Sequence, residues 1–496
     1  MKFKVLTISI STGSVPVVAM SRVECAEIDL HLNERVRILN PKNSKEIIAA
    51  VDFYDMPSFP RNTIALMSEV SKALGVRNGN YVDIEREDSP ISIKYIKEKL
   101  QGEPLTKDKV EIIINDIVKG RLTDIDLTYF VSGCYTHGLN IREIVDLTKA
   151  IVNTGDKLNL KSTPDEKIFD KHCVGGVAGN RTTMLVIPII AAFGIKIPKT
   201  SSRAITSPAG TADTMEVLAN VCLDSKRLEE VVRKTNACIV WGGALNLAPA
   251  DDKILRIEHP LSIDTDGLML SSILAKKYSV GSTHILIDIP YGNDAKVKTQ
   301  SRAKRLRKLF IKIGKLLGMR IKVMITDGTE PIGNGVGPLL EAIDVLKVLR
   351  NDPTAPQDLR KKTLFMAAEL LNMQIRSITR CRKIVTEILD SGKAYHKFMQ
   401  IIEAQGKKKL PELARFRFTI IAEKSGKIIF IDNSHISKIA RFCGAPKTKE
   451  AGLYMHKKVG DKVNREDALI TLYSSNEQSL NYAKDYYYKC NAYKIK

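Results

Sequence analysis

The stretch DKHCVGGVAGNRTTM, residues 170–184, places three glycines and an alanine between a Lys-His pair and two threonines. Glycine lets a ligand approach the backbone closely, so that backbone N–H groups act as donors. The residues before the stretch, Ile168 and Phe169, are predicted to end a strand, and Thr182 to Phe193 are predicted to form an apolar helix. A strand, a glycine-rich turn and a helix N-terminus together bind anions, because unpaired N–H groups point at the ligand. The sequence therefore predicts a phosphate site.

Strands and helices alternate on both sides of this stretch, over residues 161–345. The predicted strands are Lys167–Phe169, Ile195–Ile197, Ala237–Trp241, Thr283–Ile289 and Arg320–Ile325. This order favours a mostly parallel sheet covered by helices, with a binding site in the loops at the carboxyl ends of the strands. We therefore expect an α/β phosphate-binding domain.

Residues 89–160 show helical periodicity and predict a bundle lobe, which helices within 245–280 are expected to join. Three helices are indicated by caps and apolar spacing: Asp108–Lys119, one that Thr123 begins and His137 ends, and one that Asn140 begins and Thr154 ends. Asn140 and Glu143 fit a capping box at the start of the third helix. Short links between these helices predict an antiparallel bundle.

At 496 residues the chain is too long for one core, so further domains are expected. Within residues 1–88, DLHLNERVRI from Asp29 reappears 46 positions later as GVRNGNYVDI, which predicts two interleaved halves of a β-barrel-like domain with an assembly or regulatory role. Residues 346–411 predict a helical connector, and residues 412–496 predict a C-terminal α+β domain. The strands expected in the C-terminal domain are Arg417–Ala422, Lys427–Asp432, Gly452–Met455 and Ala468–Tyr473.

The net charge of +21 is compatible with nucleic acid, an anionic membrane or an anionic substrate as partner. Lys and Arg are spread along the chain, and the densest segment, residues 301–320, has apolar residues at helical spacing. An amphipathic helix packed on a sheet is favoured there over a membrane or nucleic-acid helix. The eight cysteines form no CxxC pair and no long apolar run occurs, so we expect a cytoplasmic protein without structural zinc, disulfides or a membrane span.

A second candidate loop, SSRAITSPAGTADTMEV, follows the predicted strand around Ile197 and precedes a predicted helix near Asp213. Hydroxyl groups and a guanidinium in this loop suit phosphate or carbonyl oxygens. The side chains concerned are Ser201, Ser202, Arg203, Thr206, Ser207 and Thr211. Small polar residues also simply fill tight turns, but two such loops after strands of one sheet favour an oxyanion pocket.

A third segment, residues 255–277, places Ser272 and Lys276 on one face of a predicted helix, with Arg256 and Asp264 before it. Arg256, Ser272 and Lys276 form a donor cluster that suits a planar ring bearing carbonyl groups. A solvated helix face is the alternative, and the segment by itself favours that alternative.

DKHCVGGVAGNRTT, SSRAITSPAGTADTME, NLAPADD and SSILAKK together resemble the thymidine phosphorylase/AMP phosphorylase family, over nearly the whole chain. The resemblance implies that phosphate attacks the anomeric carbon of a nucleoside or nucleotide and releases the base and a sugar 1-phosphate. It matches phosphate-binding positions to Lys171, Thr182, Thr183, Ser201 and Thr211, and pyrimidine-binding positions to Arg256, Ser272 and Lys276. Cationic side chains or an acid would stabilise the departing base.

In the AMP-using branch the resemblance implies a different set of nucleotide contacts, with Asp264 as the proton donor to the base. These contacts are Gly176, Ser202, Arg203, Ala204, Ile205, Thr206, Ser207, Thr211, Ser272 and Lys296. The N-terminal repeat resembles the extra domain of the archaeal-type AMP phosphorylases and the bacterial type-2 thymidine phosphorylases. It also suggests a homodimer or larger oligomer. No cofactor or metal is needed, because no carboxylate cluster adjoins the phosphate loops.

Two departures from the family pattern and one resemblance to a branch of the family bear on phosphate binding and on the substrate. Cys173 replaces a phosphate-binding serine, and the neighbouring His172 is either a second donor or a packed loop residue. Residues 207–210 read Ser-Pro-Ala-Gly, where the thymidine enzymes carry a histidine near the base. Residues 355–360 instead resemble the type-2 thymidine branch, so we expect thymidine phosphorolysis, with AMP phosphorylase as the alternative. A magnesium-dependent phosphoribosyltransferase and a basic nucleic-acid-binding protein remain as hypotheses from other classes.

Overall fold

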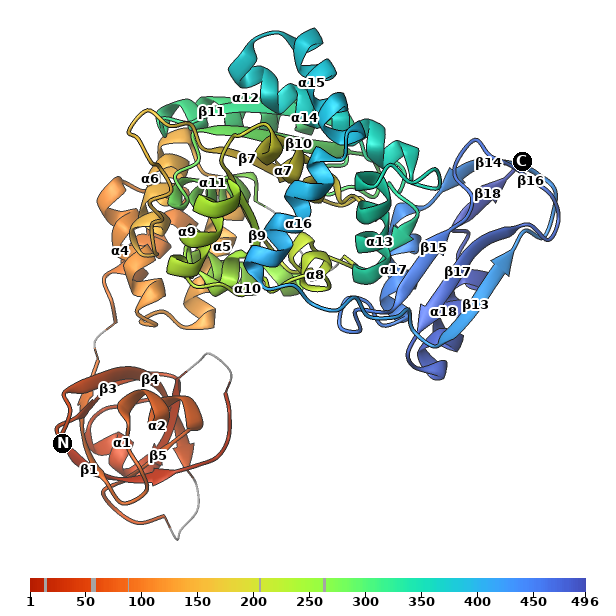
Figure 1. Ribbon diagram of the computed structural model, residues 1–496. Helices are drawn as coiled ribbons and strands as arrows, with labels where there is room; N and C mark the ends of the chain where they lie inside the picture. The colour runs from red at the N-terminus through yellow and green to blue at the C-terminus, as the bar shows by residue number, and fades with distance from the viewer. Residues whose placement is uncertain (13–15, 55–58, 88, 205–206, 262–264) are drawn as a thin grey trace. The chain divides into compact units, whose positions relative to one another are not determined.

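The computed structural model describes residues 1–12, 16–54, 59–87, 89–204, 207–261 and 265–496, and only the backbone of 259–261. The chain divides into two compact units, one of Met1–Thr154 and Pro249–Ser271 and the other of Gly155–Ala248 and Ser272–Lys496. They contain a closed β-barrel, a helical bundle, parallel α/β sheets and a C-terminal α+β domain, which confirms the predicted fold class (Figure 1). The predicted domain limits stay predictions. Among the described helices, none combines the length and the apolar character that a bilayer crossing needs.

The N-terminal barrel is built from two interleaved copies of one motif, as the sequence repeat predicts. Its strands are β1 (Lys2–Thr7), β2 (Val17–Ser21), β3 (Arg35–Asn40), β4 (Lys45–Tyr54), β5 (Thr63–Leu66) and β6 (Tyr81–Arg86), in the order β1-β5-β2-β4-β3-β6. Ala19 lies opposite Ala65, and Ile38 lies opposite Ile84. Each of these pairs is 46 positions apart in the chain. Equivalent residues facing each other indicate an approximate two-fold axis through the barrel. Short helices α1 (Arg22–Glu27) and α2 (Ser68–Leu74) follow β2 and β5 in the two copies.

Three helices of the bundle begin and end within one residue of the positions that the sequence signals predict. The helices of the bundle are α3 (Ser92–Leu100), α4 (Lys107–Val118), α5 (Asp124–His137), α6 (Ile141–Asn153) and α10 (Pro249–Leu261). Thr123 caps α5, and Asn140 caps α6 in a complete capping box with Glu143. Glu143 also forms a buried ion pair with Lys99, with 2.8 Å between Oε1 and Nζ. Lys253 on α10 donates hydrogen bonds to the last carbonyls of α4.

The α/β part contains two parallel sheets, one of β7 (Phe169–Cys173), β10 (His284–Tyr291) and β11 (Arg320–Asp327), and one of β8 (Ile197–Ser201) and β9 (Ala237–Trp241). A backbone hydrogen bond of 2.9 Å from Phe169 N–H to Lys196 O links β7 to the residue before β8. β7 and β8 extend further toward their carboxyl ends than predicted, because their polar residues are buried within the sheet. Asp170, Lys171 and Lys199 were expected to follow strands and instead form part of them.

Helices on these sheets supply most of the core. They are α7 (Thr182–Ala192), α8 (Thr211–Glu216), α9 (Ser225–Thr235), α11 (Asp266–Ser279), α12 (Gln300–Leu316), α13 (Pro338–Leu349), α14 (Gln357–Ile375), α15 (Ile378–Asp390) and α16 (Lys393–Gln405). Every residue of α7 is buried, apart from partial exposure of Ala192. The basic segment at 301–320 forms α12, which buries Leu306, Phe310 and Ile313 against β10 and β11. The predicted amphipathic helix is therefore confirmed.

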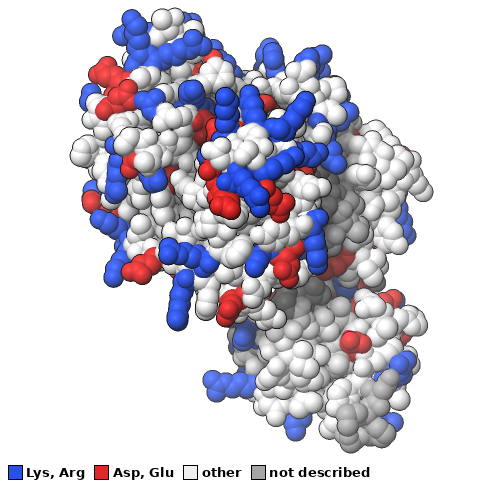
Figure 2. Space-filling model, turned by 90° about the vertical axis from the view of Figure 1, so that its right-hand side faces the viewer, with Lys and Arg blue, Asp and Glu red and all other residues white. Residues whose placement is uncertain are grey.

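The C-terminal domain contains β13 (Phe416–Ile421), β14 (Gly426–Ile431), α17 (Asn433–Phe442), β15 (Gly452–Met455), β16 (Lys462–Val463), β17 (Ala468–Ser474), α18 (Glu477–Lys489) and β18 (Tyr493–Ile495). β13 and β14 are neighbours in sequence but belong to different sheets, of order β12-β15-β17-β13 and β16-β14-β18. The short strand β12 (Gly335–Val336) precedes α13 and pairs with β15, so the α/β part and the C-terminal domain share a sheet. On the face drawn in Figure 2, Asp and Glu are interspersed among the Lys and Arg side chains.

The buried ion pair of the bundle gives a stability prediction. In Glu143→Gln the side chain keeps its size, but the Lys99 ammonium loses its carboxylate in a buried setting. We expect a loss of about 3 kcal/mol in the local unfolding free energy of α6, measured by amide hydrogen exchange. Glu111→Gln is the matched control, because the Lys107–Glu111 pair is exposed with 3.7 Å between the charged atoms. Its loss should stay below about 0.5 kcal/mol, and equal losses in the two variants would contradict the prediction.

Candidate functional site

Lys171 lies at the centre of the candidate phosphate site, on β7 just before the glycine-rich loop. Its side chain is fully buried, and Nζ donates hydrogen bonds to the hydroxyls of Thr182 at 2.9 Å and Thr183 at 3.1 Å. Burial lowers the pKa of this ammonium. Among the described residues, no carboxylate lies within 4.0 Å of Nζ. The first turn of α7 and the end of β7 thus hold a cation that lacks an anionic partner.

The glycine-rich loop packs so closely that two of its glycines cannot be replaced without strain. Gly176 has a φ of +92°, and a Cβ there would lie 2.3 Å from the backbone N of Lys296. Gly179 has a φ of +70°, and a Cβ there would lie 2.1 Å from the carbonyl oxygen of Ile332. Within the described part of the chain, no hydrogen bond engages the N–H groups of Gly176 and Val177. The loop therefore offers free backbone donors, as the sequence predicts.

Next to Lys171 lies a buried polar cluster that the sequence did not reveal. Lys277 on α11 pairs with Asp170 on β7, with 2.8 Å between Nζ and Oδ2, and both side chains are buried. Burial, followed by the charge of Lys277, holds the pKa of Lys199 well below its usual value. Burial and the same cations also lower the pKa of His172 well below its usual value, so this imidazole is neutral at pH 7. In the sequence, the only sign of this cluster is Lys277, the second lysine of the SSILAKK motif.

The second candidate loop begins where β8 ends, at Ser201. The Ser201 hydroxyl is buried and has no hydrogen-bond partner within the described residues. Asp213 on α8 ties the loop together, because its Oδ2 accepts hydrogen bonds from Ala204 N–H at 2.6 Å and Gly210 N–H at 3.0 Å. Of the other predicted contacts, Ser202 and Ser207 are exposed, Thr211 begins α8 at partial exposure, and Ile205 and Thr206 lie outside the described residues.

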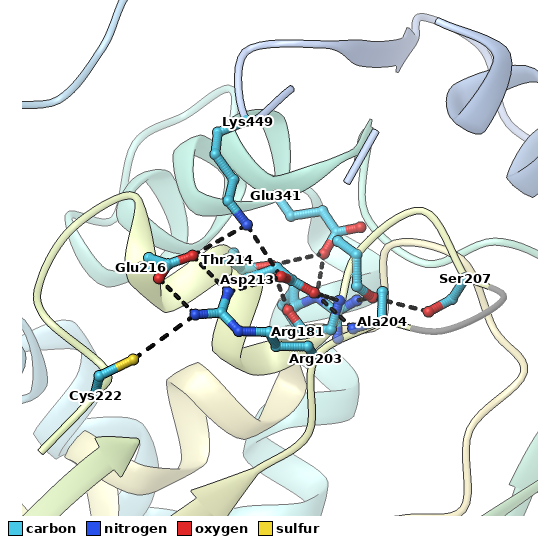
Figure 3. A network of polar contacts seen from close by, with 12 residues as sticks. Arg181, Arg203, Ala204, Ser207, Asp213, Thr214, Glu216, Cys222, Glu341 and Lys449 are labelled. Carbon is cyan, nitrogen blue, oxygen red and sulfur yellow. Dashed lines mark hydrogen bonds and ion pairs between the residues drawn. The ribbon is translucent and has the colours of Figure 1, made fainter. Parts of the chain in front are cut away.

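Two arginines near this loop are held by carboxylates (Figure 3). Both guanidinium Nη atoms of Arg203 contact Glu216, at 2.6 and 2.7 Å, and the guanidinium stacks on Trp241 with 4.8 Å to the ring centroid. The hydrogen bonds from Arg203 lower the pKa of Glu216 to about 2. Arg181 contacts Glu341 and the carbonyl oxygen of Ala209. Both cations are therefore neutralised within the protein.

The predicted base contacts are distributed over both units of the chain. Ser272 and Lys276 are half-buried on one face of α11, and Lys296 is exposed on the loop after β10. Arg256 lies on α10 in the other unit, is exposed and pairs with Asp124 at the start of α5. Asp264 lies outside the described residues.

The Cys173 thiol stands at the end of β7, where the family pattern has a serine. Its Sγ accepts a hydrogen bond from the Asn180 side-chain amide at 3.6 Å. Burial raises the pKa of this thiol to about 11, so it is protonated at neutral pH. Over the described ranges, no group of three or more His, Cys, Asp or Glu side chains is placed to hold a metal ion.

Comparison with family models identifies three parts of the chain. A helical bundle domain and an a/b domain of the glycosyl transferase family match residues 93–155 and 165–395. A pyrimidine nucleoside phosphorylase C-terminal domain matches residues 427–494. Among solved structures, anthranilate phosphoribosyltransferase from Thermus thermophilus superposes with a TM-score of 0.53 and 17% identity, covering 62% of this chain and 98% of that one. This likeness shows a shared fold.

Curated relatives cover almost the full length. A "Putative thymidine phosphorylase" from Legionella pneumophila (strain Paris) is 42% identical, covering 91% of this chain and 87% of the relative. An "AMP phosphorylase" from Pyrococcus furiosus is also 42% identical, covering 97% of this chain and 95% of the relative. Identity of this extent confirms the resemblance read from the sequence motifs. The chain belongs to the glycosyl transferase family 3 / pyrimidine nucleoside phosphorylase family.

Proposed function

We propose that the protein catalyses reversible phosphorolysis of a pyrimidine nucleoside, converting thymidine and phosphate to thymine and 2-deoxyribose 1-phosphate. The observation that carries this proposal is the buried Lys171 ammonium without a carboxylate partner. A buried charge is costly unless it is paired, and a bound phosphate would supply the missing charge. The unpartnered Ser201 hydroxyl and the free N–H groups of the glycine-rich loop suit the same anion. Relatives named putative thymidine phosphorylase support this substrate.

The proposed reaction exchanges one bond of the anomeric carbon for another. A phosphate oxygen forms a bond to that carbon while the glycosidic C–N bond breaks, and the base leaves with the bonding electron pair. Lys171 and the hydroxyls of Thr182 and Thr183 orient the phosphate against the positive charge that develops on the sugar. Family resemblance assigns a pyrimidine base to Ser272, Lys276 and Arg256, and in the AMP-using branch it assigns protonation of the base to Asp264. These roles, and contacts to Lys296, are predictions.

Phosphorolysis of AMP is the second candidate, and two observations favour it. The AMP phosphorylase from Pyrococcus furiosus aligns over 95% of its own length, and the second loop has Ser-Pro-Ala-Gly at 207–210 in place of a base-binding histidine. A nucleotide carries an additional phosphate that needs cations. Lys296 is exposed and could supply one of them, but Arg181 and Arg203 would have to leave Glu341 and Glu216, which is why we rank the nucleoside first.

A side-by-side phosphorolysis assay with thymidine, uridine, AMP and CMP tests the substrate. We expect phosphate-dependent release of base from thymidine and uridine, at a kcat/KM well above that for AMP and CMP. Base release is followed by chromatography, and omission of phosphate is the control. Cleavage of AMP and CMP with thymidine untouched would establish the second candidate instead.

Removal of the Lys171 charge tests the phosphate site directly. Lys171→Met keeps the length of the side chain but leaves the loop without its cation, so we expect kcat/KM for phosphate to fall by roughly 10³-fold. The control is Lys308→Met, which removes an exposed lysine from α12 and should leave activity within twofold. Circular dichroism checks that the fold survives. Activity of Lys171→Met close to wild type would overturn the proposed role.

The pH profile gives a further test, because phosphate binding requires a protonated Lys171. Burial lowers the pKa of this side chain below the ordinary 10.5. Deprotonation on raising the pH removes the cation, so kcat/KM for phosphate should decline on the alkaline side with a midpoint below 10.5. His172 is already neutral, so its protonation contributes no limb near its usual value. An alkaline midpoint at or above 10.5 would contradict this assignment.

A further inference from the structure

The glycine-rich loop is held from outside by a residue of the C-terminal domain. Asn433, the first residue of α17, is 1% exposed. Its Oδ1 accepts a hydrogen bond from Ala178 N–H at 2.9 Å, and its Nδ2 donates one to Gly176 O at 2.6 Å. The side-chain amide therefore pairs with the loop as a neighbouring strand would.

This contact fixes the direction in which one backbone N–H group of the glycine-rich loop, that of Val177, points. In a trans peptide the carbonyl and the following N–H point in opposite directions. Because Asn433 fixes the Gly176 carbonyl, it turns the Val177 N–H away from itself, and that N–H has no partner among the described residues. The start of α17 thus fixes the direction of the peptide group between Gly176 and Val177.

The C-terminal domain also reaches the second loop, through Lys449. Its Nζ lies 3.0 Å from Asp213 Oδ1 and 3.2 Å from Glu216 Oε2 (Figure 3). The backbone carbonyl of Lys449 accepts a hydrogen bond from Leu339 N–H at 3.0 Å, which anchors this segment to α13. The position of Lys449 is therefore fixed at both its backbone and its ammonium group.

Lys449 completes the charge balance of the second loop. Asp213 and Glu216 supply two negative charges, and Arg203 and Lys449 supply two positive ones. Asp213 is the residue that joins Ala204 and Gly210 at the two ends of the loop. Without Lys449, one negative charge would remain uncompensated beside a loop that has to accept a phosphate anion.

We propose that Asn433 and Lys449 are positioning residues through which the C-terminal domain holds both loops in their phosphate-binding shape. The inference rests on the proposed function, in that it assigns phosphate to these loops. Neither residue is expected to touch phosphate, and each acts through the loop that it holds. Loss of either residue should therefore weaken phosphate binding and leave the nucleoside site intact. The effect should appear in KM for phosphate, with kcat at saturating phosphate and KM for the nucleoside nearly unchanged.

The test compares matched variants of the full-length protein. Asn433→Ala removes both hydrogen bonds to the glycine-rich loop, and Asn433→Ser is a second variant that lacks the amide but keeps a small polar side chain, while Asp432 still caps α17. Lys449→Met removes the charge, and Lys449→Arg restores it. Lys457→Met is the control for Lys449→Met, because Lys457 is in the same domain, is 28% exposed against 26% for Lys449, and pairs at 3.1 Å with Asp467, which belongs to neither loop. Asn476→Ala, which removes the cap of α18, is the control for Asn433.

Phosphate binding is measured in two ways, by steady-state kinetics and by titration of inorganic phosphate without nucleoside. Trp241, the one tryptophan of the chain, stacks on Arg203 at the second loop, so its fluorescence reports on binding there. We expect roughly tenfold weaker phosphate binding in Asn433→Ala, Asn433→Ser and Lys449→Met. Lys449→Arg and both controls should stay within twofold of wild type.

The inference is overturned if folded Asn433 and Lys449 variants bind phosphate as wild type does, if they lose kcat alone, or if the controls weaken binding equally. Failure of the proposed function has a different signature. In that case the wild-type protein releases no base from any nucleoside or nucleotide tested, whatever the variants do in the phosphate titration.

Discussion

The ammonium group of Lys171 lies in the protein interior between two threonine hydroxyls, without a carboxylate among the described residues. Burying a cation in this way costs free energy that the surrounding structure has to supply. Helix α7, which is apolar after its first turn, contributes to it, since its buried side chains fix the first turn that carries Thr182 and Thr183. The buried Asp170–Lys277 pair fixes the other side of the same strand. The site therefore contains a buried positive charge without a carboxylate partner among the described residues, and the well-packed core around it holds that charge in place.

The loops around this cation have little freedom of their own. Gly176 and Gly179 approach neighbouring backbone so closely that a side chain would not fit, and Asp213 ties the second loop at both ends. Such ties reduce the reorganisation needed when an anion binds. Asn433 and Lys449 extend this restraint to the C-terminal domain, which the α/β part already joins through the pairing of β12 with β15.

The comparisons separate what the fold provides from what individual residues decide. Anthranilate phosphoribosyltransferase from Thermus thermophilus shares the arrangement at 17% identity, and one fold can serve several chemistries. Relatives at about 42% identity still carry two different names. In this chain, Glu216 pairs with Arg203 and Glu341 pairs with Arg181 beside the second loop.

The sequence by itself determined the features that depend on neighbouring residues. The caps at Thr123 and Asn140 set the starts of α5 and α6, the 46-residue repeat predicted the barrel, and β9 lies at its predicted position. Tertiary structure alone decided which buried charges pair, which is why β7 and β8 were placed too early: Asp170 and Lys199 resemble surface residues until Lys277 is packed against them. It also decided that Arg203 pairs with Glu216. The contact between Asn433 and Gly176 joins residues that are 257 positions apart in the chain. No local pattern encodes such contacts, because they exist only once separate elements have packed together.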